Sequence, residues 1–300
     1  MSKPKIVLPE GDDERVCLAA RTLIEENYNV HPILIGDVDE ITSKLAEYKG
    51  SFTCLPPDSS FQVELKISIE AKGKKFSVED HTLVHGACLV RDGEADGIVA
   101  GAVATTSDVF RTYVKTIGLQ EGVSRATSCF LMERGAERYI FADCGLNPLS
   151  TATELAETAN LCAIFAKTLS IKPRIAFLGF QTVDNAEHPV LLPIVEAVKV
   201  SRETYGLTAA GPLQFDAALS PKVAKIKTLE STVAGKANVY IFPDLNSGNI
   251  AYKITERLGG FKATGPLFLG FGKPAHDLSR GCSIADIVRA VEIAAKQSNL

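Results

Sequence analysis

The chain's densest group of chemistry-bearing side chains occupies residues 276–286, which read His-Asp-Leu-Ser-Arg-Gly-Cys-Ser-Ile-Ala-Asp. An apolar-periodic stretch follows at 287–295, so the pattern predicts a glycine-containing loop that leads into a helix. Ser279 and Arg280 would then lie just ahead of a helix N-terminus. A hydroxyl, a guanidinium and unpaired backbone N–H groups gathered there form a good site for a phosphoryl group.

Asp286 adds a carboxylate to this group, and two interpretations of it are open. Ser283 and Asp286 have the spacing of a capping box, in which the serine is the N-cap and the acid stands at N3. This structural role does not exclude chemistry, because an N3 carboxylate at the mouth of a cleft can still accept a proton. Asp286 is therefore a candidate general base as well as a helix cap.

A second candidate anion site lies in residues 96–111, which read Asp-Gly-Ile-Val-Ala-Gly-Ala-Val-Ala-Thr-Thr-Ser-Asp-Val-Phe-Arg. The pattern predicts a strand, a loop of small residues and a helix begun by Thr105 or Thr106. Arg111 would lie about one turn into that helix, where a cation gains nothing from the helix dipole. Anion binding and a surface salt bridge remain alternative roles for Arg111.

A third candidate lies in residues 231–253, where a strand is expected to end at Pro243-Asp244 and a polar loop to lead into a helix. Asn246, Ser247, Gly248 and Asn249 would offer backbone and side-chain donors at the carboxyl end of that strand. The alternative is a turn followed by an N-cap, with no ligand involved.

Several classes of chemistry lack their usual sequence signatures. The chain has no CxxC pair, HExxH, GxxxxGK[ST] or GxSxG, and no GxGxxG follows a first strand. His81 and His85 have the i, i+4 spacing of metal ligands, but no cysteine or carboxylate set accompanies them. We therefore expect neither a metal nor a bound cofactor.

Composition indicates a cytoplasmic protein that binds neither nucleic acid nor a membrane. The formal net charge is −4 with both signs interspersed, which gives no support for nucleic-acid binding. The seven cysteines are odd in number and scattered through apolar runs, as expected for reduced thiols. No segment reaches the roughly 20 apolar residues of a membrane span, and no leader-like stretch opens the chain.

Short β-branched runs alternate with longer amphipathic stretches, which predicts an α/β fold with a largely parallel sheet. A length of 300 residues favours two domains. Helical spacing is clearest at 14–25. The strands we expect are 5–8, 32–35, 97–100, 138–142, 174–178, 237–242 and 267–270. Ligands of such folds bind beyond the carboxyl ends of the strands, which is where the three candidate segments fall.

Taken together and in order, these segments resemble the phosphate acetyl/butyryl transferase family over nearly the whole chain. The motifs that carry the resemblance are 5–15, 96–101, 141–145, 213–218, 233–239, 242–253 and 273–281. The family implies a two-domain fold like that of isocitrate and isopropylmalate dehydrogenases, with the active site in the cleft between domains. Domain I would comprise residues 1–120 and 266–300, and domain II residues 121–265.

The resemblance also implies a reaction, acyl transfer between coenzyme A and inorganic phosphate that gives acetyl phosphate, without metal or prosthetic group, in a homodimer. Matched residue by residue, Asp286 would take the thiol proton and Ser279 would stabilise developing negative charge. Arg280 and Arg111 would hold phosphate. The other residues expected to bind phosphate or coenzyme A are Thr105, Ser128, Asn246, Gly248, Asn249 and Lys253.

Three features depart from the family pattern, one of which is a shortened segment around residues 50–75. Residues 69–75 read Ile-Glu-Ala-Lys-Gly-Lys-Lys in place of an arginine-containing stretch, so lysines would contact the phosphates of coenzyme A, with less geometric selectivity. Residues 180–188 also differ from the family's loop. The alternative functions are transfer of a longer acyl group, such as butyryl, and a non-catalytic acyl-CoA sensor.

Overall fold

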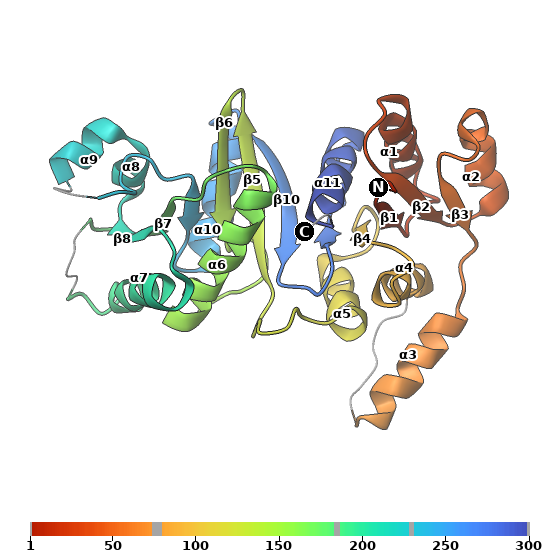
Figure 1. The fold of residues 1–300 in the computed structure, drawn as a ribbon, viewed down its shortest axis with the longest axis horizontal. Coiled ribbons are helices and arrows are strands. Elements are labelled where there is room, and N and C mark those ends of the chain that lie inside the picture. The colour runs from red at the N-terminus through yellow and green to blue at the C-terminus, as the bar shows by residue number, and fades with distance from the viewer. Residues whose placement is uncertain (1, 74–79, 183–186, 228–230, 299–300) are drawn as a thin grey trace. The chain divides into compact units, whose positions relative to one another are not determined.

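A computed structural model describes residues 2–73, 80–182, 187–227 and 231–298. These residues form two compact units, one of Met1–Gly122 with Phe271–Leu300 and one of Val123–Gly270. The α/β fold class with two domains is confirmed. Each unit has its own sheet (Figure 1) and its own cluster of buried apolar side chains.

The first unit contains a five-stranded sheet in which every pair is parallel. Its strands lie in the order β11-β4-β1-β2-β3. They are β1 Lys5–Leu8, β2 His31–Ile35, β3 Thr53–Leu55, β4 Gly97–Ala100 and β11 Ala275–Asp277. Its helices are α1 Glu14–Glu25, α2 Val38–Lys44, α3 Ser60–Ala71, α4 His81–Arg91, α5 Thr106–Thr116 and α11 Ile284–Gln297, with a 3-10 turn at Ala46–Tyr48.

Helices cover both faces of this sheet, which explains why β4 is buried throughout and β1 is apolar and buried from Ile6 to Leu8. Helices α1 and α11 pack together over one face, with Leu23 and Val291 buried in a shared cluster (Figure 1). Helix α4 packs on the other face at Gly86, where an added Cβ would lie 3.0 Å from Cγ1 of Val7. A fully covered parallel sheet leaves only its strand ends open to ligands.

The second unit has a mixed six-stranded sheet in the order β10-β5-β6-β9-β7-β8. Its strands are β5 Thr127–Arg134, β6 Glu137–Ala142, β7 Ile175–Leu178, β8 Ala209–Leu213, β9 Val239–Ile241 and β10 Lys262–Leu269. Its helices are α6 Ala152–Thr168, α7 Leu192–Tyr205, α8 Phe215–Leu219, α9 Pro221–Lys227 and α10 Leu245–Arg257. The buried helix α6 begins at a capping box formed by Thr151 and Glu154.

This second sheet departs from the expected parallel arrangement, since β10 pairs with β5, and β5 with β6, in the antiparallel sense. The cause is local. A tight turn at Gly135, with φ of 59°, joins β5 to β6 as a hairpin, so this connection needs no crossover helix. The remaining pairs, β6 with β9, β9 with β7 and β7 with β8, are parallel.

The prediction of a polar loop after Pro243 is wrong. Asp244 is the N-cap of α10 and accepts a hydrogen bond from the Ser247 N–H at 2.8 Å, so the helix already begins at Leu245. Residues 246–249 therefore form its first turn. The alternative of a turn and an N-cap holds here, because a capping aspartate satisfies the amides that a loop would have left open.

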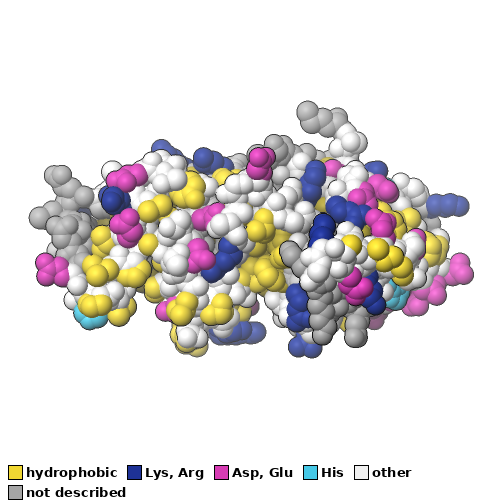
Figure 2. Space-filling model, turned by 90° about the horizontal axis from the view of Figure 1, so that it is seen from below, with side chains coloured by type: hydrophobic (Ala, Val, Ile, Leu, Met, Phe, Trp, Pro, Cys, Tyr) yellow, Lys and Arg dark blue, Asp and Glu magenta, His cyan; other side chains and the backbone are white. Residues whose placement is uncertain are grey.

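Acidic and basic side chains are interspersed on the face of the molecule drawn in Figure 2, in keeping with the small net charge. Among the described residues, no helix combines the length and the apolar character needed to cross a bilayer.

Candidate functional site

The polar edge of the first unit lies where β1, β4 and β11 end. These three strands are adjacent and parallel, so the segments that follow them meet at one edge of the sheet. Glu10 follows β1, the loop 101–105 follows β4, and Ser279 and Arg280 follow β11. Two of the three candidate segments therefore meet at this edge, and Glu10 joins them from the loop after β1.

Glu10 fixes the loop after β4. Its Oε2 accepts hydrogen bonds from the N–H groups of Gly101 and Ala102 at 2.9 and 2.8 Å. Its Oε1 accepts from Val103 and Ala104 at 2.9 and 2.7 Å. The side chain is 9% exposed, and charge-assisted bonds of this kind are strong. Because the carboxylate occupies all four amides, a substrate anion must be bound by other groups.

Arg15 joins this loop to the segment after β11. Its Nη1 donates to the carbonyl oxygens of Arg280 and Cys282 at 2.8 and 3.1 Å, and its Nη2 donates to that of Ala102 at 2.8 Å. The Arg15 side chain also binds Asp13 at 2.8 Å, and this hydrogen bond lowers the pKa of the Asp13 carboxyl. The backbone that carries Arg280 is thus held in register with the loop 101–105.

Thr105 and Arg111 lie at the start of α5. Thr105 is its N-cap and accepts from the Asp108 N–H at 3.2 Å, which matches the predicted helix start. Arg111 donates to the Ser107 hydroxyl at 2.6 Å and to Asp108 Oδ1 at 3.5 Å. The salt bridge considered for Arg111 is therefore present. Its side chain is still 46% exposed, so the guanidinium remains accessible to an anion.

Ser279 and Arg280 are both exposed beyond β11. The Ser279 hydroxyl oxygen accepts a long hydrogen bond of 3.3 Å from the Gly281 N–H, which leaves its own proton available to donate. Within the described part of the chain, the Arg280 guanidinium has neither an ion pair nor a hydrogen bond. An exposed, uncommitted guanidinium beside a hydroxyl suits recognition of a phosphoryl group.

Asp286 forms the capping box that its spacing predicts. Its Oδ2 accepts from the Ser283 N–H and hydroxyl at 2.9 and 2.8 Å, and the Ser283 oxygen accepts from the Asp286 N–H at 3.3 Å. The carboxyl is half-buried at the first turn of α11. The helix cap holds this carboxylate in one orientation, as a base needs.

Asp277 is a buried carboxyl that the sequence argument missed. It ends β11, is 0% exposed, and neither of its oxygens has a well-formed hydrogen bond to a described residue. An added Cβ at Gly101 would lie 2.2 Å from its Oδ1, so only glycine fits above it. Burial raises the pKa of Asp277 to about 7, whereas the nearby Thr106 side chain and Leu278 N–H lower it.

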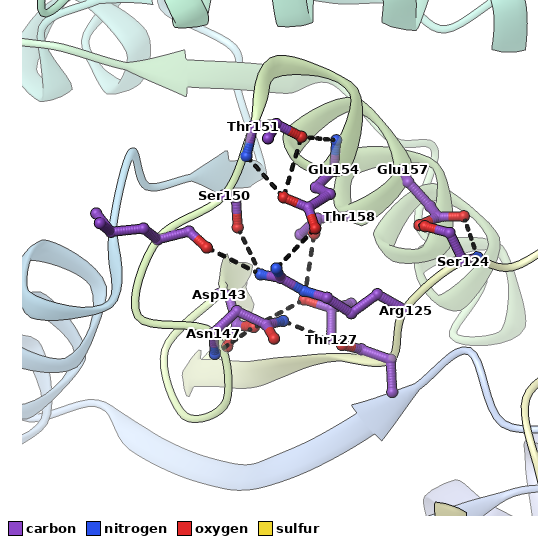
Figure 3. A network of polar contacts seen from close by, with 12 residues as sticks. Ser124, Arg125, Thr127, Asp143, Asn147, Ser150, Thr151, Glu154, Glu157 and Thr158 are labelled. Carbon is purple, nitrogen blue, oxygen red and sulfur yellow. Dashed lines mark hydrogen bonds and ion pairs between the residues drawn. The ribbon is translucent and has the colours of Figure 1, made fainter.

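The second unit presents a polar loop after β6, built around Asp143 (Figure 3). Asp143 is almost fully buried, and its two oxygens accept six hydrogen bonds. The donors are the hydroxyls of Thr127 and Ser128, the N–H groups of Gly145, Leu146 and Asn147, and the Asn147 side-chain amide. Their distances run from 2.5 Å for Ser128 to 3.2 Å for the Asn147 N–H.

Helix α10 is seated against this loop. Gly248 is buried, and an added Cβ there would lie 2.3 Å from the Asp143 carbonyl oxygen. The Asn249 side chain donates to the Cys144 carbonyl oxygen at 3.1 Å. Asn246 and Lys253 are exposed on the same helix. The third segment therefore divides into residues that hold the helix in place and residues that face solvent.

Comparisons with known proteins decide the family. The family described as phosphate acetyl/butaryl transferase matches residues 1–295. The phosphate acetyltransferase of Staphylococcus epidermidis is 39% identical over 311 residues, which cover 98% of this chain and 94% of that protein. The Bacillus subtilis phosphate acetyltransferase is 38% identical with the same coverage. This chain belongs to the phosphate acetyl/butyryl transferase family.

A solved structure agrees with that assignment. A phosphotransacetylase from Streptococcus pyogenes superposes with a TM-score of 0.88 at 40% identity, covering 99% of this chain and 94% of that one. The resemblance expected from the motifs is thereby confirmed, and the chain is an acyltransferase enzyme.

The family's predicted site residues fall into two groups. The first unit brings Thr105, Arg111, Ser279, Arg280 and Asp286 to its strand ends and to the helices that follow them. The second unit holds Ser128, Asn246, Gly248, Asn249 and Lys253 on β5 and α10. Of the lysines expected to contact coenzyme A, Lys72 is exposed after α3, whereas Lys74 and Lys75 lie outside the described residues.

Reasoning from sequence missed Glu10, Arg15, Asp277 and Asp143. The sequence did contain a signal for these four residues, because each of them follows or ends a predicted strand or lies in a family motif. Their partners are distant along the chain, however, and no local spacing reveals them. Glu10 is 91 residues from Gly101, and Arg15 is 265 residues from Arg280.

The His81–His85 pair has no metal-site surroundings in the described residues, which contain no group of three His, Cys, Asp or Glu side chains that could hold an ion. His85 is buried, stacks on Phe61 at 4.7 Å and accepts from the Asp58 N–H at 3.3 Å. Its role is packing, and burial lowers its pKa.

Proposed function

We propose that this enzyme transfers an acetyl group reversibly between coenzyme A and inorganic phosphate, the reaction named for its relatives. The observation that carries the proposal is the strand-end site of the first unit. There the guanidinium of Arg280, which has no ion pair or hydrogen bond to a described residue, lies in the same segment as the hydroxyl of Ser279 and the carboxylate of Asp286. Arg15 ties this segment to the loop after β4.

In the direction of acetyl-CoA synthesis, Asp286 accepts the proton of the coenzyme A thiol. A thiol with a pKa of about 8.5 is only a few per cent ionised at neutral pH, so a positioned base raises the fraction of attacking thiolate. The thiolate forms a C–S bond to the acetyl carbonyl, and the C–O bond to phosphate then breaks. The electron pair leaves with phosphate, so the transfer is direct and needs no acyl-enzyme.

Positive charge makes this attack feasible. The thiolate and acetyl phosphate are both anionic, and their approach is opposed unless cations offset the charge. Arg280 and Arg111 supply two guanidinium forks for the phosphoryl oxygens, and Ser279 donates to the oxyanion that forms on the carbonyl. Thr105 positions the start of α5, whose dipole favours an anion at that end.

The residues of the second unit serve coenzyme A in this proposal. Asn246 and Lys253, both exposed on α10, contact its phosphates. Gly248, Asn249 and Ser128 act indirectly, because the first two seat α10 on the loop at 143–147 and Ser128 donates to Asp143.

We further propose that the enzyme works in the cytoplasm as a homodimer, without metal or prosthetic group. Its seven cysteines are all free, which suits a reducing compartment. Ile250 and Ile254 of α10 and its C-cap residue Leu258 form an i, i+4, i+8 stripe, and they are 57%, 53% and 84% exposed. A second copy that covers this stripe would remove apolar surface from water.

The test is phosphate-dependent release of free coenzyme A from acetyl-CoA, followed by thiol titration. Asp286→Asn should lower kcat by about a hundredfold or more. The amide oxygen of asparagine can still accept the hydrogen bonds of the capping box, but it cannot accept the proton of the thiol. The chain offers a matched control in its other capping box, where Glu154→Gln makes the same acid-to-amide change at the first turn of α6 in the second unit. Wild-type kcat in Asp286→Asn would remove it as the base. Turnover of butyryl-CoA equal to that of acetyl-CoA would overturn the acetyl preference.

A further inference from the structure

The second unit has a pocket of about 480 Å³ at the edge of its sheet opposite the Asp143 loop. Strands β6, β9 and β7 are parallel neighbours, and the pocket lies at their amino ends, at residues 137–139, 174 and 237–238. The loop at 143–147 and the start of α10 follow the carboxyl ends of β6 and β9. The pocket thus has no part in the site already described.

Four cations line this pocket, namely Arg138, Lys172, Arg174 and Lys236. Within the described residues, none of the four has an ion pair with a carboxylate. Glu137 is the carboxylate among the lining residues, and it is already paired with Arg134 at 2.9 Å. In a protein with a net charge of −4, such a concentration of unpaired positive charge is unusual, and it attracts an anion into the hollow.

A buried amide fixes the backbone at two of the basic residues, and the two guanidinium groups are anchored on carbonyl oxygens. Asn238 is 8% exposed, its oxygen accepts from the Arg174 N–H at 2.8 Å, and its amide donates to the Lys172 carbonyl oxygen at 2.9 Å. The Arg174 guanidinium donates to the Lys236 carbonyl oxygen. The guanidinium of Arg138 is anchored in turn on the Leu169 carbonyl oxygen at 3.3 Å. Preorganised cations bind an anion with less loss of side-chain entropy.

Part of the pocket wall is apolar. Ile171 and Ala237 are buried beside it, and the ring of Tyr139 is half-buried at the same wall, packed edge-on against Tyr240 at 5.8 Å. A fixed aromatic ring beside several cations matches a ligand with one flat apolar part and one highly charged part. Inorganic phosphate would leave this wall unused.

We propose that this pocket binds a nucleoside diphosphate group, with the phosphoryl oxygens on the four cations and the base against Tyr139. The same chemistry occurs in free nucleotides and in the nucleotide end of coenzyme A. The proposal does not depend on the acetyl-transfer reaction, because it concerns binding at the other edge of the sheet.

Isothermal titration of the full chain with ADP tests the proposal. The double variant Lys172→Ala/Lys236→Ala removes two of the four cations and should weaken ADP binding by about a hundredfold, since each charge-assisted contact contributes about tenfold. The matched control Lys199→Ala/Lys225→Ala removes two exposed lysines of the same unit that do not line the pocket, and its ADP affinity should equal that of the wild type. Both double variants should retain the wild-type KM for acetyl-CoA and phosphate.

Four results would overturn the proposal. The first three are no ADP binding at millimolar concentration, equal affinities in the two double variants, and a rise in the KM for acetyl-CoA that parallels the loss of ADP binding. Pyrophosphate bound as tightly as ADP would also sink the nucleotide assignment, because it lacks the flat group. Competition by coenzyme A that is lost in Lys172→Ala/Lys236→Ala would identify its nucleotide end as the ligand, and no competition would identify a free nucleotide.

Discussion

The polar loops of the two units are both built on a buried carboxylate, but by different means. Glu10 reaches from the end of β1 to four amides of a loop that begins 91 residues later. Asp143 instead organises its own loop and the neighbouring strand, and accepts six hydrogen bonds. A third carboxyl, Asp277, lies beneath the Glu10 loop without a well-formed hydrogen bond.

This difference indicates that the polar loop of the second unit is a structural scaffold, whereas that of the first unit belongs to the reactive site. In the second unit the buried carboxylate is fully satisfied and its loop is a rigid seat for α10. In the first unit one carboxylate is satisfied and another is not, and the exposed groups Arg111, Ser279 and Arg280 stand around them. A carboxyl that is buried without a well-formed hydrogen bond destabilises the fold, so such groups are expected at a functional site rather than in a scaffold.

Removal of the Asp143 side chain should produce the largest effect on stability. Asp143→Ala leaves several buried donors without an acceptor, and we expect a loss of about 4 to 5 kcal/mol in the free energy of unfolding. Urea unfolding at neutral pH measures this. Asp216→Ala is the control, because Asp216 is an exposed residue of the same unit paired with Lys227, and its removal should cost far less stability than that of Asp143. Similar losses in the two variants would contradict the scaffold role.

The next largest effect should be a pH dependence from Asp277. Its pKa rises from 3.8 to about 7 on folding, so the native state binds the extra proton between these values. Stability from this group is complete below pH 3.8 and is lost as the pH rises through about 7, to a total of roughly 4 kcal/mol. Glu10 and Tyr113 are the titratable groups coupled to it.

Asp277→Asn should abolish this contribution. The measurement is the difference in unfolding free energy between wild type and variant at several pH values from 4.5 to 8, so that the titration of other groups cancels. We expect the variant to gain stability relative to the wild type as the pH rises. A difference that stays constant across this range would show that Asp277 is ionised throughout.

A smaller effect is expected from Glu10→Gln, which keeps the shape of the side chain but turns one acceptor oxygen into a donor. Two of the four loop amides then lose their partner, which should cost about 2 kcal/mol of stability. The KM for phosphate should rise about tenfold, with a smaller change in kcat, because the loop that leads to Thr105 and Arg111 loosens.

Glu157→Gln is a matched control for this change. Glu157 is also buried and accepts from the Ser124 N–H at 2.8 Å and from the Ser124 hydroxyl, but it lies in the second unit (Figure 3). It should lose comparable stability while the KM for phosphate stays at the wild-type value. If the two variants changed the KM equally, Glu10 would have no specific positioning role.

Sequence reasoning succeeded where the determinant is local. Strands 5–8 and 97–100 and the helix 14–25 match the structure at both ends, because buried β-branched runs and an amphipathic period specify them directly. The start of α5 at Thr105 and the capping box of α11 also follow from spacing within four residues. The shortened β9, Val239–Ile241, shows that pairing partners rather than propensity set strand ends.

The rest of the site depends on contacts between distant residues. Nothing near Glu10 in the sequence indicates that its carboxylate binds residues 101–104, and Asp277 reads as an ordinary polar residue before Ser279 and Arg280. Burial of its carboxyl follows from the position of β11 beside β4 and from Gly101 above it, which only the assembled sheet provides. The antiparallel pair of β10 with β5 is unreadable from sequence for the same reason.

The smallest effect is expected for the ion pair between Arg111 and Asp108. Both side chains are well exposed, so the pair should contribute about 0.5 kcal/mol or less. Asp108→Asn should therefore leave stability nearly unchanged but lower the KM for phosphate, because Arg111 no longer has a competing carboxylate. The two variants should therefore have opposite effects on the KM for phosphate: Asp108→Asn lowers it, whereas Glu10→Gln raises it. Initial rates at varied phosphate measure the change, and a higher KM in Asp108→Asn would mean that the ion pair orients Arg111 for phosphate instead of withholding it.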